Sequence, residues 1–494
     1  MSVLLQIGRR PPDRNPASAP GPAPDAEAVS AAGSGGGPLG LAAETKVFRS
    51  AHGAHLFVAD GSRIYDLPEA AADRLERWTA AAHDPAQDVA VAAGLGLPLW
   101  GGAGTPPPRI DGTPAAVPPL ASLSLNVMQA CNLSCGHCYA DEGRFGGSAR
   151  AMPRETAFAA VDRLLAEAAP GAAVVVGFMG GEPLLARDLL HEVVAHATRA
   201  GAATGHAVRF ALTTNLTTVR PADAELFAAH PFTVAVSLDG DRVGHDALRR
   251  APGGGSAYDR LRAGLEVLDR YGRPRHLSAR VSVTPYTGRL IDILEHGIGL
   301  GFDEVGFSAV VSAPDAAYEI DTAAFTGFLT QMVECGQAAL RELAAGRPYP
   351  FGNFQTAMYE LHTGGHRPYP CGAGAGYLSA SAEGGLYACH RLVDDPAFAM
   401  GSLAQGPDQE ARAAHLAARH VDRAEPCRSC WARYLCGGGC YHEVSRRGRT
   451  GCDYIRGWLA FCLRAYVELS QTAPEFFREP TASDLPSDPA ALAR

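Results

Sequence analysis

Lysine is nearly absent from this sequence of 494 residues, in which Lys46 is the single example. Acidic residues outnumber basic ones and the net charge is −9, whereas a large nucleic-acid interface needs a basic patch. No apolar run approaches the roughly 20 residues that span a bilayer. Residues 1–16 have prolines and charges where a signal peptide has its apolar core. We therefore expect a cytoplasmic protein that binds neither nucleic acid nor membrane.

Cysteine is missing from the first 130 residues, although the chain contains 12. Three fall within residues 131–138, eight lie between 371 and 462, and Cys335 stands alone. Reducing conditions in the cytoplasm oppose a disulfide framework. Clusters of cysteine in that compartment indicate metal binding.

Large apolar residues are scarce in residues 1–44, which are rich in Pro, Ala, Gly and Ser and are expected to be a disordered tail. Residues 46–82 then show short alternating strands, with turns at His52-Gly53 and Asp60-Gly61, and a helix from about Leu67-Pro68. The expected organisation is a strand-rich element at 45–100, a linker at 101–120, an α/β domain at 121–330, a helical bridge at 331–370, a cysteine-rich domain at 371–466 and a tail at 467–494.

Six apolar strands alternate with amphipathic helices between residues 123 and 310. The predicted strands are 123–128, 173–179, 208–214, 233–240, 277–284 and 304–310. Repeated βα units of this kind imply a parallel sheet with right-handed crossovers, either open or closed into a partial barrel. Active sites in such α/β folds lie at the C-terminal ends of the strands, and the first three cysteines directly follow the first strand.

Cys131, Cys135 and Cys138 can hold three corners of a [4Fe–4S] cluster, whose usual complement is four thiolates. The missing ligand would leave one iron open to a cofactor or substrate. The alternative is a closed zinc site, for which His137 is an available fourth ligand.

The stretch "CNLSCGHCY" resembles the CxxxCxxC signature of the radical S-adenosylmethionine (SAM) enzymes. "FMGGEPLL" is similar to the GGEP motif of that family, "TTNLT" to its TNG-like turn, and "SLDGDRVGHDALRR" to a segment of its peptide-modifying members. The sequence departs from the pattern at Leu216, where the turn often has Gly. The resemblance implies a partial (β/α)6 barrel in which SAM chelates the open iron and is cleaved to a 5′-deoxyadenosyl radical.

The resemblance also implies roles for residues at the strand ends. Gly180 and Gly181 would let backbone approach the methionyl group, and Glu182 would receive its ammonium. The full set of implied cofactor-binding residues is Tyr139, Gly180, Gly181, Glu182, Pro183, Asn215 and Ser237. Asp239 is the candidate base for a substrate thiol, with Asp246 behind it, although Asp239 could instead bind ribose or simply form a turn.

The C-terminal cysteines resemble the SPASM domain, which holds two auxiliary [4Fe–4S] clusters, so that SAM and three clusters are expected in all. That resemblance assigns Cys427, Cys430, Cys436 and Cys452 to one cluster, and Cys371, Cys389 and Cys440 to the other. Cys462 shares a helical face with Ile455 and Leu459 and is expected to be the eighth ligand, the alternative being a core thiol. A zinc ribbon would not need eight cysteines.

SPASM enzymes act on peptides or small proteins and need an external one-electron reductant. Residues 46–82 are similar to the winged-helix-like elements that capture such substrates as an added strand. The stretches 369–395 and 436–458 look most like the quinohemoprotein amine dehydrogenase maturation proteins, which form thioethers from Cys to Asp or Glu. The alternatives are another SPASM maturase (sactipeptide-type, C–C crosslinking or sulfatase formylglycine-forming), or a zinc or electron-carrier protein without catalysis.

Overall fold

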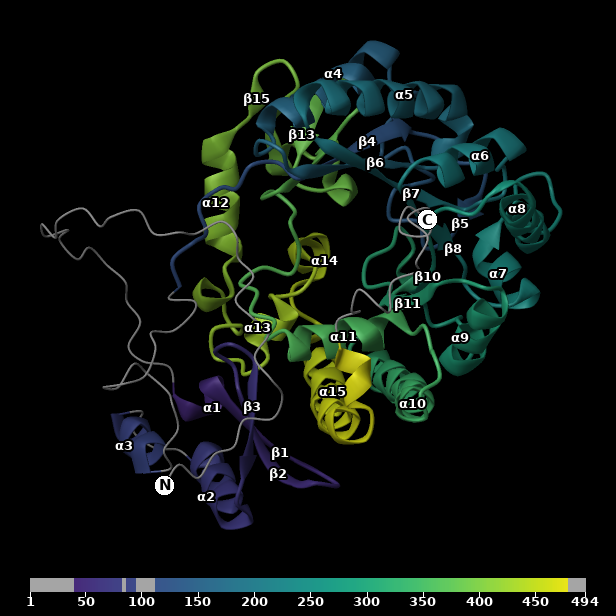
Figure 1. Cartoon of the computed structure of the whole chain (residues 1–494). Helices are drawn as coiled ribbons and strands as arrows, with labels where there is room; N and C mark the ends of the chain where they lie inside the picture. The colour runs from purple at the N-terminus through teal and green to yellow at the C-terminus, as the bar shows by residue number, and fades with distance from the viewer. Residues whose placement is uncertain (1–39, 82–85, 95–111, 479–494) are drawn as a thin grey trace, which may run out of the picture.

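The computed structural model describes residues 40–81, 86–94 and 112–478. Its central feature is a ten-stranded sheet in the order β11-β10-β8-β7-β6-β4-β12-β13-β14-β15 (Figure 1). The six strands from β11 to β4 pair in parallel and are β4 (Ser122–Met128), β6 (Ala173–Gly180), β7 (Ala207–Thr214), β8 (Phe232–Ser237), β10 (His276–Val283) and β11 (Glu304–Ala309). The predicted α/β fold with six parallel strands is confirmed.

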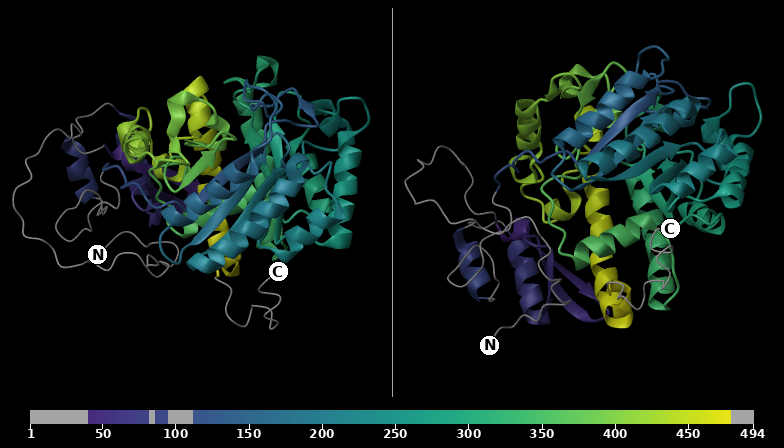
Figure 2. Two further views of the ribbon diagram at one scale, coloured as in Figure 1. Left: turned by 90° about the horizontal axis from the view of Figure 1, so that it is seen from above. Right: turned by 45° about the horizontal axis from the view of Figure 1, so that its top comes forward.

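Helices follow the parallel strands and cover the outside of the curved sheet (Figures 1 and 2). They are α4 (Arg154–Glu167), α5 (Arg187–Thr204), α6 (Pro221–Ala229), α7 (Arg242–Leu248), α8 (Ala257–Tyr271) and α9 (Leu290–Gly299). Their apolar faces pack on strands whose side chains are buried, and Phe210 stacks on Phe232 at 5.1 Å within this core. Within the described ranges, no helix combines the length and the apolar composition that crossing a membrane requires.

The cysteine-rich C-terminal part continues the same sheet. Strand β12 (Tyr377–Ala380) pairs in parallel with β4, and its Tyr377 hydroxyl lies 2.8 Å from Oγ of Ser124. Strands β13 (Gly385–Tyr387), β14 (Ala399–Ser402) and β15 (Gly406–Pro407) then follow in antiparallel order. The barrel and the C-terminal part are therefore joined by backbone hydrogen bonds as well as by side-chain packing.

Further helices pack beneath and beside this sheet. Two long ones, α10 (Ala324–Ala344) and α15 (Cys452–Thr472), lie side by side, with α11 (Gly352–His362) against α15 (Figure 1). The smaller ones are α12 (Gln409–Arg419), α13 (Arg433–Cys436) and α14 (Tyr441–Arg447), and the 3-10 turns are η1 (Pro183–Ala186), η2 (Ala316–Tyr318), η3 (His390–Leu392), η4 (Pro396–Phe398), η5 (Val421–Arg423) and η6 (Pro474–Phe477). The boundaries expected at 330 and 466 fall inside α10 and α15, so each helix continues across them.

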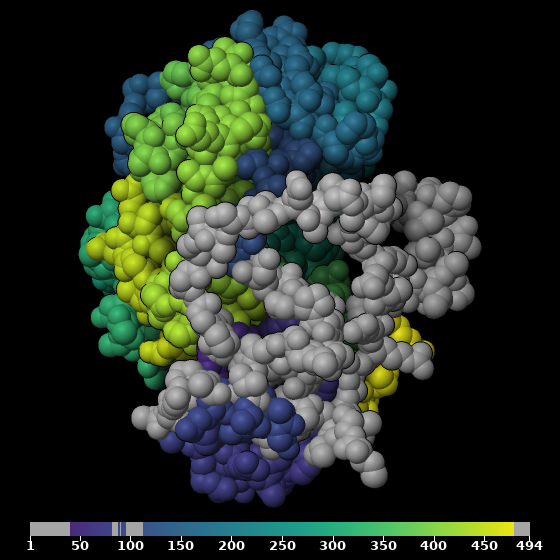
Figure 3. Space-filling model, turned by 90° about the vertical axis from the view of Figure 1, so that its left-hand side faces the viewer, coloured from purple at the N-terminus to yellow at the C-terminus, as the bar shows by residue number. Residues whose placement is uncertain are grey.

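The N-terminal element forms a separate small core. Its sheet has the order β1 (Thr45–Ser50), β2 (Gly53–Val58) and β3 (Arg63–Leu67), all antiparallel, and is followed by α2 (Glu69–Ala80) and α3 (Ala86–Gly94). The expected strands, both turns and the helix after Pro68 are confirmed. The short helix α1 (Leu41–Glu44) also belongs to this element, because Leu41 is fully buried in its core, so the folded part begins before residue 45. Figure 3 shows the element below the barrel and the C-terminal part. The other residues of the expected N-terminal tail and most of the linker lie outside the described residues.

Candidate active site

The three clustered cysteines leave the C-terminal end of β4 and face the inside of the barrel. Ser134 and Cys135 form the short strand β5, which pairs with β9 (Arg249–Arg250) and so fixes the loop. Sγ of Cys131 accepts a hydrogen bond from Nδ2 of Asn215 at 3.7 Å, and Sγ of Cys135 accepts one from Nη1 of Arg249 at 3.8 Å. Donors aimed at sulfur favour thiolates, the form in which cysteine ligates metal.

Cys131, Cys135 and Cys138 line a cavity of about 530 Å³ inside the barrel, which we call the barrel cavity. Burial raises the pKa of Cys131 to about 12 and that of Cys135 to about 11, so a thiolate here needs a positive partner. Across the described residues, no three His, Cys, Asp or Glu side chains lie close enough together to hold a single metal ion.

Gly180 and Gly181 end β6 at the edge of the barrel cavity. Gly180 has φ of +142°, and a Cβ there would lie 2.3 Å from the carbonyl oxygen of Met128. A Cβ on Gly181 would lie 2.3 Å from the carbonyl oxygen of Ala130. Both glycines therefore let β6 pass directly against the start of the cysteine loop, in addition to lining the cavity.

Glu182 is fully buried and does not line the barrel cavity. Its Oε1 accepts hydrogen bonds from Oγ1 of Thr214 at 2.8 Å and from the amide of Leu184 at 3.0 Å, while Oε2 accepts from the amide of Asn215 at 2.7 Å. The carboxylate thus ties the end of β6 to the turn after β7. Pro183 is buried at the start of η1.

Asn215 begins the turn after β7 and lines the barrel cavity. Its Nδ2 group also donates to Oδ1 of Asn132 at 3.0 Å, which adds a second link to the cysteine loop. The next residue, Leu216, has φ of +60°, the left-handed conformation that glycine adopts most easily. The departure from glycine therefore leaves the turn conformation in place, with the Leu216 side chain fully buried.

Ser237 ends β8 and lines the barrel cavity, but the two predicted acids beyond it do not. Asp239 is fully buried; its Oδ2 accepts from Nε of Arg249 at 2.7 Å and its Oδ1 from the amide of Ser282 at 2.8 Å. Although burial opposes ionisation, the pKa of Asp239 is lowered, chiefly by the charge of Arg249. Asp246 accepts a hydrogen bond from the amide of Tyr258 at the start of α8. This geometry gives both carboxylates positioning roles rather than contact with a substrate thiol.

Seven of the eight C-terminal cysteines form two groups. The first cysteine group is Cys371, Cys389 and Cys440, and the second cysteine group is Cys427, Cys430, Cys436 and Cys452. The pKa of Cys389 is raised to about 11, chiefly by burial, with Arg391 opposing the rise and the other two thiolates of its group contributing to it. The pKa of Cys427 is likewise raised to about 11, chiefly by burial, with Arg449 opposing the rise and the other three thiolates of its group contributing to it. Members of each group are therefore close enough to interact.

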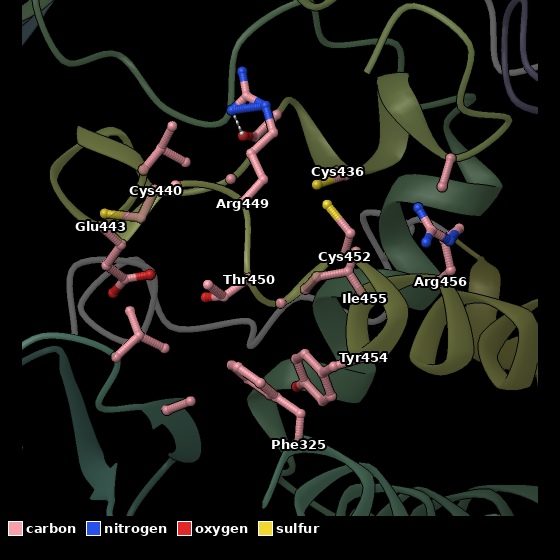
Figure 4. A pocket seen from close by; sticks show the side chains of 18 of the residues that line it. Phe325, Cys436, Cys440, Glu443, Arg449, Thr450, Cys452, Tyr454, Ile455 and Arg456 are labelled. Atoms are coloured by element: carbon pink, nitrogen blue, oxygen red, sulfur yellow. Dashed lines mark hydrogen bonds between the residues drawn. The ribbon is translucent and has the colours of Figure 1, made fainter. Parts of the chain in front are cut away.

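A second cavity, of about 450 Å³, is lined by the whole second cysteine group and by Cys440; we call it the C-terminal cavity. Figure 4 shows the sulfur atoms of Cys436 and Cys452 facing one another, with Cys440 on the opposite side near Glu443. Nη1 of Arg449 donates to the carbonyl oxygen of Gly438 at 3.2 Å, which anchors the loop between them.

Cys462 is the exception among the C-terminal cysteines. It is fully buried on α15 and does not line the C-terminal cavity. Ten residues separate it from Cys452 on the same helix, which at 1.5 Å per residue is about 15 Å along the axis. The expectation that Cys462 is an eighth ligand is therefore not supported, and the alternative of a core thiol fits. Cys335 is likewise buried, on α10, as expected.

Residues 125–290 match the model of the radical SAM superfamily, and this stretch holds all four strand-end motifs. This stretch is similar to a radical SAM domain. A serine-type anaerobic sulfatase-maturating enzyme of Klebsiella aerogenes is 24% identical over 354 residues, which cover 68% of this chain and 84% of that protein. An uncharacterised protein of Archaeoglobus fulgidus is 23% identical over 334 residues, 66% of this chain and 75% of that protein.

The solved structure of native anSMEcpe with bound AdoMet and a peptide shares the fold, with a TM-score of 0.61 and 18% sequence identity. The match covers 72% of this chain and 99% of that one. Residues 125–290 are thus similar to the radical SAM superfamily, and the chain shares the fold of a structure solved with AdoMet and a peptide. The shared fold agrees with the large parallel sheet.

Tyr139 joins the radical SAM domain to the C-terminal part. Its half-buried ring lines the barrel cavity, and the guanidinium carbon of Arg391 lies 4.8 Å from the ring centroid. His390 and His442 approach the same ring edge-on at 6.3 and 6.1 Å. The ring, which was expected to bind the cofactor, is therefore also the contact surface for Arg391, which follows Cys389 by two residues.

Sequence reasoning did not single out Arg249, Arg391 or Glu443 as site residues. Arg249 lies at the end of the motif "SLDGDRVGHDALRR", between the two cysteine-rich regions of the sequence. An arginine there could have been predicted to pair with an anionic group such as a thiolate or a carboxylate. Arg391 and Glu443 gave no such signal, because their contacts join segments that are far apart in the chain.

Proposed function

We propose that this protein is a radical SAM enzyme that forms a thioether between a Cys sulfur and an Asp or Glu side-chain carbon of a peptide or small protein. A quinohemoprotein amine dehydrogenase small subunit is the proposed substrate. The observation that carries the proposal is that the barrel cavity and the C-terminal cavity share lining residues. Ser308, Ala309 and Val311 on one side, and Arg391 and Glu443 on the other, border both. These two adjoining cavities are bordered by all three cysteines of the barrel loop, by the whole second cysteine group and by Cys440 of the first.

Cys131, Cys135 and Cys138 would hold the cluster that binds SAM, and the two C-terminal groups would hold the auxiliary clusters. When bound, these groups supply one-electron chemistry, including a 5′-deoxyadenosyl radical that abstracts hydrogen. Asn215 and Arg249 orient the cysteine loop through their contacts with sulfur. The backbone of Gly180 and Gly181, together with Ser237, forms the wall against which SAM would lie.

The two C-terminal groups differ in the number of thiols they offer. The second cysteine group supplies four, the usual complement of a cluster. The first supplies three, because the structure leaves Cys462 in the core of α15. The first group would therefore keep one position open, and the proposed occupant is the thiol of the substrate Cys. An external one-electron reductant is still required.

The N-terminal element at 46–82 is proposed to capture a leader segment of the substrate as an added strand. A three-stranded sheet leaves two edge strands, here β1 and β3, with backbone groups that a peptide can pair with. The structure of anSMEcpe with a peptide supports a peptide substrate for a protein of this fold.

A second candidate function is formylglycine formation in a sulfatase, which the similarity to the Klebsiella enzyme favours. The two products are distinguishable. A thioether removes a free thiol without creating a carbonyl, whereas formylglycine creates an aldehyde. A hydrazine probe and a thiol-alkylating reagent applied to the same product separate the two reactions.

The test uses the full chain, reconstituted anaerobically, with a quinohemoprotein amine dehydrogenase small subunit as substrate. We expect about twelve iron atoms per chain, four for each of three clusters, and 5′-deoxyadenosine upon reduction. The triple variant Cys131→Ala/Cys135→Ala/Cys138→Ala should keep the auxiliary iron but make no 5′-deoxyadenosine. The matched control is Cys335→Ala, which removes a buried thiol outside all three groups. A triple variant that still cleaves SAM would refute the assignment.

A further inference from the structure

Arg391 lies where three cavities meet. It lines the barrel cavity and the C-terminal cavity, and also a third cavity of about 530 Å³ bordered by Ser312, Pro314 and Asp394, which we call the side cavity. Its backbone amide donates to Sγ of Cys389, and its guanidinium stacks on the Tyr139 ring beside Cys138. The side chain is thus placed between the radical SAM cysteines and the first cysteine group.

The hydrogen-bonding capacity of Arg391 is largely unused. Nη1 donates to Oε1 of Glu443 at 3.1 Å, but no acceptor among the described residues lies within hydrogen-bonding reach of Nε or Nη2. The side chain is 30% exposed and that of Glu443 is 28% exposed, both toward the cavities. Because the Tyr139 ring covers one face of the guanidinium, the free N–H groups are available in its plane.

The other two arginines that line the barrel cavity are paired with carboxylates that lie behind the cavity surface. Nε of Arg249 lies 2.7 Å from Asp239, and Nη2 of Arg280 lies 3.2 Å from Glu304. Neither partner lines the cavity. Arg391 differs because its partner, Glu443, is a cavity residue itself, held by a single contact that a competing carboxylate can replace.

We propose that Arg391 binds the side-chain carboxylate of the substrate and thereby selects an acidic residue for modification, with Glu443 as the intramolecular competitor. This inference deepens the proposed function and rests on it. A guanidinium with free N–H groups binds a carboxylate through paired, charge-assisted hydrogen bonds, and partial enclosure strengthens them. Binding at Arg391 places the carbon next to that carboxylate between the two cysteine centres. Glu443 keeps the cation neutralised until the substrate arrives.

The test measures binding of two blocked synthetic peptides that differ only in one residue, Asp or Asn, and contain one Cys. Each is titrated calorimetrically into the reconstituted wild-type enzyme with SAM present. The Asp peptide should bind about tenfold more tightly, the size expected when one hydrogen-bonded charge is removed. Arg391→Gln should abolish this preference, and Arg391→Lys should restore part of it. Glu443→Gln should increase the preference, because the competitor is gone.

The matched control is Arg446→Gln on the same helix as Glu443. Arg446 borders the side cavity but is paired with Asp395 at 3.1 Å, so its loss should leave the Asp preference unchanged. Iron content and SAM affinity are measured for every variant, since Arg391 lies close to Cys389. Weaker SAM binding by Arg391→Gln at full iron content would make Arg391 a cofactor ligand and overturn the proposal.

Glu443→Gln tests the proposal with the opposite sign and so does not depend on the stability of the Arg391 variants. An unchanged or reduced Asp preference in Glu443→Gln would refute the competition. If wild-type enzyme cleaves SAM with either peptide yet shows no Asp preference, the carboxylate site fails while the proposed function stands. If SAM is not cleaved at all, the proposed function itself fails.

Discussion

Arg433 links the N-terminal element to the cysteine-rich part, and its replacement by leucine should loosen the N-terminal element locally. The side chain is only 2% exposed, and its Nη2 lies 2.6 Å from Oε1 of Glu44. Nη1 donates to the carbonyl oxygen of Ala43 at 2.7 Å, and Nε lies 3.1 Å from Asp422. Nη1 also donates to the carbonyl oxygen of Cys430 at 3.3 Å, so Arg433→Leu would leave two carboxylates and two carbonyl groups without this donor.

Removing one partner of a buried ion pair costs about 3–5 kcal/mol, because the other charge remains buried. Each 1.36 kcal/mol is a factor of ten in an equilibrium constant. The equilibrium constant for local opening of α1 and β1 should therefore increase by a factor of between about a hundred and several thousand. Opening should stay local, because other contacts persist, including Nε2 of His52 with Glu468 at 2.9 Å. The assay is native-state hydrogen exchange over residues 40–80, read at full iron content.

A double variant separates the cost of leaving one buried charge unpaired from the loss of the contact that holds the N-terminal element in place. Burial raises the pKa of Glu44 even though Arg433 opposes the rise, so desolvation of Glu44 outweighs the attraction between them. Apolar replacement of both residues, as in Glu44→Leu/Arg433→Met, should therefore recover much of the protection lost in either single variant. Arg49→Gln is the control, since its partners Glu69 and Glu76 are exposed within the same element. Unchanged exchange in Arg433→Leu would refute the reasoning.

Three shorter predictions concern the site. Cys462→Ala should keep full iron content and unaltered cluster spectra, whereas Cys452→Ala should lose iron from the second cysteine group; iron loss in Cys462→Ala would return it to the ligands. Asp239→Asn should make the cluster of the barrel loop labile on gel filtration, because Arg249 loses its buried counter-charge beside Cys135. If this variant keeps its iron and loses only crosslinking, Asp239 is instead the catalytic base. Burial lowers the pKa of His245 from 6.5 to about 4. As the pH drops from 6.5 to 4, the unfolded state therefore binds a proton at this residue before the folded state does, and the free energy of unfolding falls by about 3 kcal/mol from this group. His245→Gln should make the free energy of unfolding, measured with urea, depend less on pH over that range.

The sheet was predictable because its strands read as short apolar runs that alternate with helices having one apolar side. The motifs at the ends of β4, β6, β7 and β8 could be placed because parallel strands bring their C-terminal ends to one edge. The three cysteines of residues 131–138 share one short loop, whereas Cys371, Cys389 and Cys440 were grouped by the resemblance.

What the sequence did not predict depends on pairing between distant segments. The parallel pairing of β12 with β4 joins Tyr377 to Ser122, and no local pattern marks it. Helical spacing placed Cys462 on one face with Leu459, but it could not tell whether that face meets a cluster or the core. Asp239 looked like a free acid because its counter-charge, Arg249, becomes a neighbour only when β9 pairs with β5.

The uninterrupted ladder from β11 to β15 limits how the molecule can admit a protein chain. Swinging the cysteine-rich part away from the barrel would require breaking the hydrogen bonds between β12 and β4, rather than bending a linker. The proposed cluster sites of the barrel loop and of the C-terminal part would therefore keep a fixed spacing. Under the proposed function a polypeptide substrate would have to enter as an extended segment between parts that do not swing apart, which favours substrates whose modified residues lie in unfolded stretches.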